Sequence, residues 1–242
     1  LQRMTQIEQE LDSFSVPKYK TITDLQASMI VDERINDAKN TISTARRDVA
    51  QGDNVAAIYN LAYAIERKFS AYAWSLFITG EGREFGLTEQ RMKISCEKKI
   101  SEAEERYQYA ALFFPGLLDN LRIGINSAYD ELALGRYESC LFRAAKAKAE
   151  TDVLLNVVGV EVEDVADLVG RKLDIAEKFI IRQTQQGVFP IVGFSYYEYA
   201  RELKDTDVFS ALLYTEYALE MSSLDLYFKE SRKLIITEKD KD

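Results

Sequence analysis

The chain has 242 residues, 47% of them apolar, with 11 glycines and 3 prolines. This length can bury a sizeable core, and the scarcity of chain-breaking residues favours long helices over a many-turned β protein. The formal net charge of −9 argues against nucleic acid as a partner, because binding to phosphates needs a basic face. The sequence contains no histidine, which excludes Ser-His-Asp and Cys-His catalysis, imidazole-bound zinc and the Glu-x-x-His pairs of di-iron bundles.

The N-terminal third predicts a short helix followed by a helical hairpin. Residues 1–14 have a helical pattern and do not begin with methionine, which suggests a piece of a longer polypeptide. A capping-box spacing at Thr23-Asp-Leu-Gln26 precedes an apolar stripe over residues 31–49, and Gly52 ends that helix. A second apolar stripe follows, made of Val55, Ile58, Ala62, Ile65, Phe69, Tyr72 and Leu76. The two stripes predict a hairpin over 31–79.

The remainder of the chain predicts further helices separated by glycine and proline. Three glycines between residues 80 and 86 indicate a loop. Helical stripes follow over residues 92–110, 118–132, 137–158, 162–180 and 208–228. The complete pattern predicts a single all-α domain, a bundle of about eight or nine helices arranged as antiparallel hairpins. Its predicted parts are an N-terminal helix and connector (1–30), two hairpins (31–158) and a C-terminal hairpin region (162–230).

The two cysteines, Cys96 and Cys140, both fall in helical stretches and lack a Cys-x-x-Cys spacing. We expect two small core residues, with a disulfide as the less favoured alternative. They do not identify a cellular compartment.

The segment Gly187–Ala200 contains Gly193-Phe-Ser195, which raises the question of a catalytic serine. The nucleophile elbow Gly-x-Ser-x-Gly would require glycine at Tyr197, as well as a histidine elsewhere in the chain. The spacing of Ser195 and Glu198 instead predicts a capping box and a helix that begins near Tyr196. The residues before it, including the pre-proline Phe189, are expected to form an extended connector.

Aromatic residues crowd this segment and the helix after it. Tyrosines at adjacent helical positions cannot all face one core, so some must lie at its rim, where they suit contacts with peptides or domains. The candidate partner-binding residues are Phe194, Tyr196, Tyr197, Tyr199, Tyr214 and Tyr217. Ordinary core packing is the alternative. No catalytic residue, metal ligand or cofactor is predicted, because carboxylate pairs such as Glu104-Glu105 fit solvated helix faces.

The helices after the turns near Gly52, Gly135 and Asp205 share a pattern of residues. They align on Val55, Tyr137 and Val208, and three columns then coincide: Ala57, Ser139 and Ser210; Ala62, Ala144 and Thr215; Ile65, Ala147 and Ala218. Small residues at such positions let helices approach closely. The pattern resembles the second helix of tetratricopeptide repeats (TPR), although the turns lie much further apart than the repeat of about 34 residues. It implies TPR-like packing of hairpins without a true array.

One further resemblance covers the C-terminal part. Residues 187–228, GVFPIVGFSYYEYARELKDTDVFSALLYTEYALEMSSLDLYF, resemble the helical region that follows the protease domain in archaeal Lon-like serine proteases. That family uses a Ser-Lys dyad and is predicted to be membrane-associated. Its catalytic motif, Pro-Lys-Asp-Gly-Pro-Ser-Ala-Gly, does not occur in this chain, so no catalytic residue is carried over. The resemblance implies that a protease domain precedes Leu1 in the parent protein.

These observations predict a non-catalytic interaction or scaffold domain. The resemblance implies that this domain is the C-terminal domain of an archaeal Lon-like protease. Its expected partners are proteins: its own protease domain, a second copy or a peptide. Two alternatives stay open, a free-standing TPR-like adaptor that binds peptides along Tyr197, Tyr199 and Tyr217, and a carboxylate-only metal hydrolase acting on nucleotides. No uncharged run approaches the roughly 18 apolar residues of a membrane span, and the localisation of the chain is not predicted.

Overall fold

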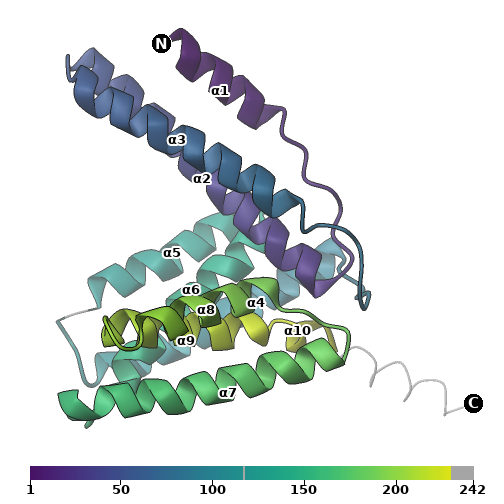
Figure 1. Ribbon diagram of the computed structural model, residues 1–242, viewed down its shortest axis with the longest axis vertical. Coiled ribbons are helices and arrows are strands. Elements are labelled where there is room, and N and C mark those ends of the chain that lie inside the picture. Colours follow the sequence, from purple (N-terminus) through teal and green to yellow (C-terminus); the bar gives the residue numbers. More distant parts are fainter. Residues whose placement is uncertain (117, 230–242) are drawn as a thin grey trace, which may run out of the picture. The chain divides into compact units, whose positions relative to one another are not determined.

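The computed structural model describes residues 1–116 and 118–229 (Figure 1). Within these residues the fold is all-α, as predicted, and its only strand-like pairing is an isolated bridge between Thr21 and Glu84. The helices are α1 (Gln2–Asp12), α2 (Ile22–Ala50), α3 (Asn54–Ser75), α4 (Glu89–Ala111), α5 (Asp119–Ala133), α6 (Tyr137–Asn156), α7 (Val165–Gln185), α8 (Ile191–Leu203), α9 (Val208–Ser222) and the short α10 (Leu226–Lys229). The end of the predicted C-terminal region, residue 230, lies outside the described residues.

The chain divides into two compact units. One contains residues 1–19 and 27–80, and the other contains residues 20–26 and the chain from residue 81 onward. The partition therefore falls within α2, whereas the sequence predicts one domain with internal boundaries near residues 30 and 158. A boundary inside a long helix leaves no proline or glycine signal in the sequence.

In the first unit, α1 packs on the hairpin of α2 and α3. Its core is formed by Met4, Ile7, Leu11, Ala38, Ile42, Ala45, Ala57 and Ala64. The predicted tight turn is confirmed at Gly52, whose φ of 82° is a left-handed conformation that favours glycine. Asp53 then caps α3, because its carboxylate accepts a hydrogen bond from the Ala56 amide at 2.9 Å.

The capping box before α2 exists, but it lies two residues earlier than predicted. The Asp24 amide donates to the Thr21 hydroxyl, and the Thr21 amide donates to the Asp24 carboxylate, both at 3.1 Å. The helix accordingly begins at Ile22 and not near residue 31. Gln26, the predicted partner in the box, is fully buried and bonds to other helices instead. Two pairs in this segment, Thr21 with Asp24 and Thr23 with Gln26, have the capping-box spacing. Gln26 is used in contacts with other helices, and Thr21 and Asp24 form the box.

In the second unit, α4 to α9 form successive hairpins with small residues at their contacts. α4, α5 and α6 share one core, which contains Ile100, Ala128 and Ala144. α7, α8 and α9 share another, which contains Val169, Ala200 and Ala218. The aligned small residues of α6 and α9 are largely buried, as expected for close packing. In α3, however, the corresponding Ala62 is exposed.

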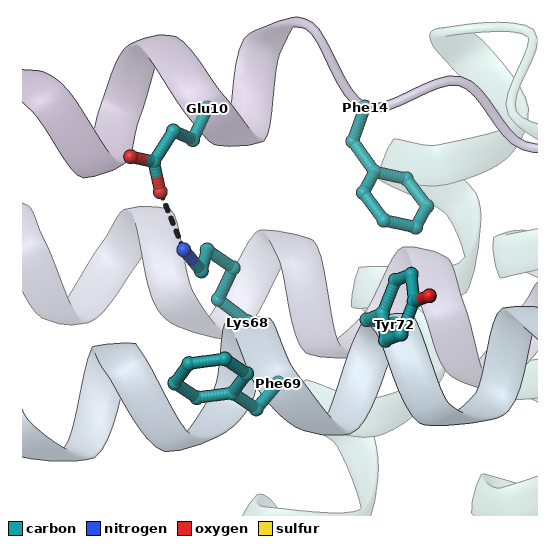
Figure 2. Close-up of a pocket in the computed structure, with 5 residues that line it drawn as sticks. All are labelled: Glu10, Phe14, Lys68, Phe69 and Tyr72. Carbon is teal, nitrogen blue, oxygen red and sulfur yellow. Dashed lines mark hydrogen bonds and ion pairs between the residues drawn. The ribbon is translucent and has the colours of Figure 1, made fainter.

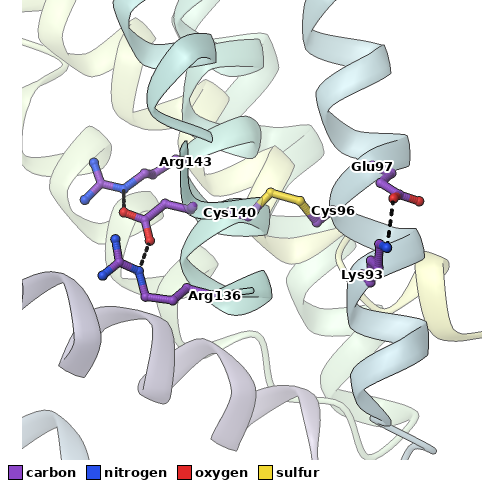
Figure 3. The surroundings of a disulfide bond; sticks show 7 residues. Lys93, Cys96, Glu97, Arg136, Cys140 and Arg143 are labelled. Atoms are coloured by element: carbon purple, nitrogen blue, oxygen red, sulfur yellow. Dashed lines mark hydrogen bonds and ion pairs between the residues drawn. A yellow bond between two sulfur atoms is a disulfide. The ribbon is translucent and has the colours of Figure 1, made fainter. Parts of the chain in front are cut away.

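The cysteines form a disulfide, so the favoured expectation of two separate core thiols is wrong. Cys96 of α4 and Cys140 of α6 are both fully buried, with Cα atoms 5.8 Å apart (Figure 3). This separation is typical of a disulfide. Sequence spacing could not show it, because the two residues meet only when the helices pack. Beside Cys140, Arg136 and Arg143 both contact the buried Glu131, at 2.5 and 3.4 Å.

The start of α8 also differs from the prediction. The helix begins at Ile191, and Ser195 lies inside it, where its hydroxyl donates to the Ile191 carbonyl at 3.0 Å. Ser195 is therefore neither an N-cap nor a nucleophile elbow. Gly193 is required by α9, since a Cβ there would lie 2.9 Å from the Ser222 amide. The helix that the sequence predicts over residues 208–228 is also shorter than expected. α9 ends at Ser222, and the chain is not helical again until α10.

Candidate partner-binding surfaces

The six predicted partner-binding residues lie together on α8 and α9. Tyr196 is in contact with both tyrosines of α9, with ring centroids 5.9 Å from Tyr214 and 5.0 Å from Tyr217. Tyr199 lies 5.7 Å from Tyr214. The other two residues, Phe194 and Tyr197, stack on each other at 6.4 Å. The sequence therefore located a real aromatic cluster, although several of its members belong to the core.

These six residues differ in how far they are buried. Tyr197 and Tyr217 are buried, Tyr196 and Tyr214 are half-buried, and only Tyr199 and Phe194 are exposed. Burial and the nearby Glu150 carboxylate raise the pKa of Tyr217, whose hydroxyl donates to that carboxylate at 2.5 Å. Burial also raises the pKa of Tyr197. Both tyrosines are thus held as neutral, packed side chains, and Tyr199 is the main tyrosine that the cluster offers to a partner.

A network of buried charges connects α4, α6 and α9. Lys99 is only 2% exposed, and its ammonium lies 2.8 Å from Glu220 and 3.0 Å from Glu102. Lys148 of α6 also pairs with Glu220, and with Asp152 at 2.9 Å. Burial alone raises the pKa of Glu220, but the two lysine charges outweigh it and the pKa is lowered. Glu220 is therefore an ionised carboxylate at the centre of this network.

A pocket of about 330 Å³ opens beside this network. Lys98, Lys99, Glu102, Glu220, Ser223, Leu226 and Tyr227 line it. The Tyr227 hydroxyl donates to Glu102 at 2.6 Å, and the Lys99 ammonium lies over the Tyr227 ring at 4.7 Å. The polar groups of this pocket are thus engaged with one another, which suits a role in joining the helices. Across the described residues, no three acidic or cysteine side chains come close enough to hold a metal ion.

A second surface, which we call the α3 outer face, consists of exposed apolar residues. Its large members are 50–81% exposed: Val55, Ile58, Tyr59, Phe69, Tyr72, Leu76 and Phe77. The smaller Ala62 and Ala73 lie among them and are exposed too. Contiguous apolar surface of this kind is unusual on a soluble protein outside interaction sites. Most of the apolar stripe that the sequence predicts after Gly52 lies on this face, whereas its member Ile65 packs against the core of the first unit.

The α3 helix packs on its unit through a different stripe. Its buried residues are Ala57, Ala64 and Ala71, one every seventh position on the opposite side. A helix with two apolar faces can bury only one of them in a hairpin, and small alanines allow the closest approach to α2 and α1. The predicted hairpin is present, but most of the larger stripe does not support it. Periodicity revealed that stripe but not the direction in which it faces.

A pocket lies at the edge of this face, within the first unit (Figure 2). It measures about 330 Å³ and is lined by Phe14, Phe69 and Tyr72, with Glu10 and Lys68 on one side. Glu10 and Lys68 form an ion pair that joins α1 to α3. Phe69 and Tyr72 belong both to the pocket and to the α3 outer face, so a side chain bound on that face could enter the pocket. Its apolar lining suits an aliphatic or aromatic group.

No family model matches this chain, and no curated protein or solved structure is significantly similar to it. Of the helices in residues 1–116 and 118–229, none is both long enough and apolar enough to span a bilayer.

Proposed function

We propose that this chain is a non-catalytic helical interaction domain. The observation that carries the proposal is the α3 outer face, whose seven large apolar side chains are at least half exposed. Burying such side chains against a partner yields roughly 1.5–3 kcal/mol for each one that becomes fully covered. Four of the seven are tyrosine or phenylalanine residues, and aromatic side chains are enriched at protein interfaces.

The parent protein in this proposal is an archaeal Lon-like serine protease, with the catalytic domain encoded before Leu1. The resemblance of residues 187–228 to the helical region of that family supports it, as does the all-α fold of the described residues. In such a protein this domain would assemble subunits, orient the catalytic domain or present substrate. Its own charged clusters join helices to each other, as the pairing of Lys99 with Glu220 illustrates.

The alternative of a peptide groove along Tyr197, Tyr199 and Tyr217 has narrower support. Tyr199 is 58% exposed, whereas the other two are buried. A peptide could contact Tyr199 and Phe194 on the surface of α8, but it would not reach all three tyrosines. The α3 outer face is the larger exposed surface.

The proposed function is tested by reading the gene sequence upstream of Leu1 and by a binding measurement. The gene upstream of Leu1 should encode a Ser-Lys protease domain, and that domain should bind the chain in calorimetry. Phe69→Glu should weaken this binding at least tenfold, and Ile175→Glu on α7 is the control, since the two residues are 58% and 56% exposed. A Tyr199→Ala variant tests the α8 surface in the same assay.

Three results would contradict the proposal. An upstream sequence without a protease domain removes the parent assignment. Peptide hydrolysis by the purified chain alone removes the non-catalytic role. Unchanged binding by both Phe69→Glu and Tyr199→Ala, in a chain that also does not associate with itself, shows that neither surface is the interface.

A further inference from the structure

We infer that the α3 outer face binds the same face of a second copy of this chain, with the two α3 helices antiparallel. This inference rests on the proposed function and names one partner for it. α3 lies wholly within the first unit, so the inference uses residues 54–77 of that unit alone.

The first argument is self-complementarity, which a two-fold interface requires because each copy presents the same patch. In an antiparallel pair that overlaps along residues 54–77, residues equally distant from the middle of the segment lie at the same level. Ala62 then faces Phe69 of the second copy, Ala73 faces Ile58, and Tyr59 faces Tyr72. Two large exposed side chains of the face, Ile58 and Phe69, thus each meet an exposed alanine. Facing large against small residues is how helices interdigitate.

The heptad spacing of the stripe gives the second argument. Val55, Ala62, Phe69 and Leu76 follow one another at seven-residue intervals along its centre. A seven-residue apolar repeat keeps one face of a helix turned towards a partner helix over several turns. α3 has a partner on its other side, where Ala57, Ala64 and Ala71 have the same spacing. The helix is thus patterned for a neighbour on both sides, and within one copy only the alanine side is buried.

The size of the face fits a dimer of modest affinity. A helix of 22 residues is about 33 Å long and about 10 Å wide with its side chains. If each helix covers about half of the circumference of the other, the pair buries on the order of 1,000 Å² in total, near the lower limit for a specific interface. We therefore expect association in roughly the micromolar range.

The charges on and around the α3 outer face favour a protein partner over an anionic lipid surface. Glu66 is the one charged residue of residues 54–77 on the exposed stripe. The neighbouring cations, Arg67 and Lys68, are directed to Asp37 and Glu10 of the same unit. Peripheral attachment to anionic lipid relies on cationic side chains at the rim of an apolar face. In the antiparallel pair the two Glu66 carboxylates approach each other near the two-fold axis, which weakens the dimer.

Sedimentation velocity of the full 242-residue chain, from about 1 to several hundred micromolar, tests this inference. The wild type should pass from the 27.7 kDa monomer to a dimer as concentration rises. Phe69→Glu should shift the dissociation constant upward at least tenfold, and Glu66→Gln should shift it downward several-fold. Ile175→Glu, at a matched exposed position on α7, should leave it unchanged. Leu76→Glu serves as a second disrupting variant if circular dichroism shows that Phe69→Glu alters the fold.

Cysteine cross-linking tests the antiparallel register. Val55 and Leu76 face each other across the pair, and the natural cysteines are buried in a disulfide. A mixture of Val55→Cys and Leu76→Cys chains should form a disulfide-linked dimer under mild oxidation, while Val55→Cys alone should not. Self-linking of Val55→Cys without linking in the mixture would show a parallel pair and overturn the inference.

A wild-type chain that stays monomeric throughout the concentration range would also overturn it, as would a dimer insensitive to Phe69→Glu and Leu76→Glu. These outcomes are distinct from failure of the proposed function. A monomeric chain that binds the protease domain through Phe69 would retain the interaction role and lose only the second copy as partner. Binding of a monomeric chain to vesicles of neutral phospholipid through the same residues would identify a lipid surface in place of the second copy.

Discussion

Gln26 accepts a hydrogen bond from the backbone amide of Val192 at 2.9 Å, and these residues are 166 positions apart in the chain. Its side-chain amide also donates to the Met221 carbonyl at 2.6 Å. One buried glutamine thus supplies partners for a free amide in the first turn of α8 and a carbonyl near the end of α9. Helix ends need such partners, because their terminal groups have none within the helix.

Replacement of Gln26 by leucine should lower the free energy of unfolding by about 2–4 kcal/mol, since two buried backbone groups would each lose a partner. Denaturant unfolding measures the change. Gln185→Leu, at an exposed position of α7, should shift the midpoint only slightly. An equal effect of the two substitutions would mean that the Gln26 bridge contributes nothing.

Gly193→Ala should destabilise the protein by about 1–3 kcal/mol, because the new methyl group would press on the Ser222 amide and the Ala218 carbonyl of α9. Gly170→Ala is the matched control. Apart from its chain neighbours and the backbone of its own helix turn, no atom of the described residues lies within 4 Å of a Cβ at Gly170 in α7, so alanine there should stabilise the helix by about 0.5–1 kcal/mol. The two variants should therefore shift the melting temperature in opposite directions.

Glu220→Gln should cost about 3–5 kcal/mol at pH 7, because the buried Lys99 would lose a counter-charge. The pKa of Glu220 is lowered below its ordinary value of 4.5, so its contribution is complete above pH 4.5 and is lost as the pH falls through the folded pKa. The difference between wild type and variant should accordingly shrink below pH 4.5. Guanidinium titrations at several pH values measure it, with the exposed Glu105→Gln as control. A difference that stays constant down to pH 3 would contradict this account.

Reduction of the Cys96–Cys140 disulfide should lower stability by about 2–4 kcal/mol, because the bond closes a segment of 44 residues and restricts the unfolded chain. Unfolding curves with and without dithiothreitol give this value. The double substitution of both cysteines by alanine should lower stability by at least as much and should make the protein insensitive to the reductant. Full sensitivity of that variant to dithiothreitol would exclude the disulfide as the cause.

The orientation of α3 can be tested by substitutions on its two sides. Ala64→Leu should destabilise the first unit by about 1–3 kcal/mol, because Ala64 is fully buried in its core. Ile58→Ser should change stability by less than about 0.5 kcal/mol in dilute solution, since Ile58 is 69% exposed. A large loss from Ile58→Ser together with tolerance of Ala64→Leu would mean that the helix faces the other way.

The helices and turns of this protein were largely predictable, because each depends on residues close together in the sequence. Gly52 and Gly135 end hairpin helices with a left-handed residue, as glycine at such positions predicts. The aromatic cluster was predictable for the same reason, since Tyr196 and Tyr199 are neighbours on one helix. The exact residues at which helices begin were predicted less accurately. The capping rule selected Thr23 and Ser195, whereas Thr21 has the capping role and Ser195 lies within α8.

The sequence by itself determined the class of fold and the existence of an apolar stripe on α3, because local propensity and periodicity act within a few turns of one helix. Only the tertiary structure decided that this stripe faces outward and that Ala57, Ala64 and Ala71 form the packed side. It also decided the pairing of Cys96 with Cys140 and of Lys99 with Glu220. Burial and charge pairing depend on which helices meet, and these contacts join residues far apart in the chain, about which periodicity carries no information.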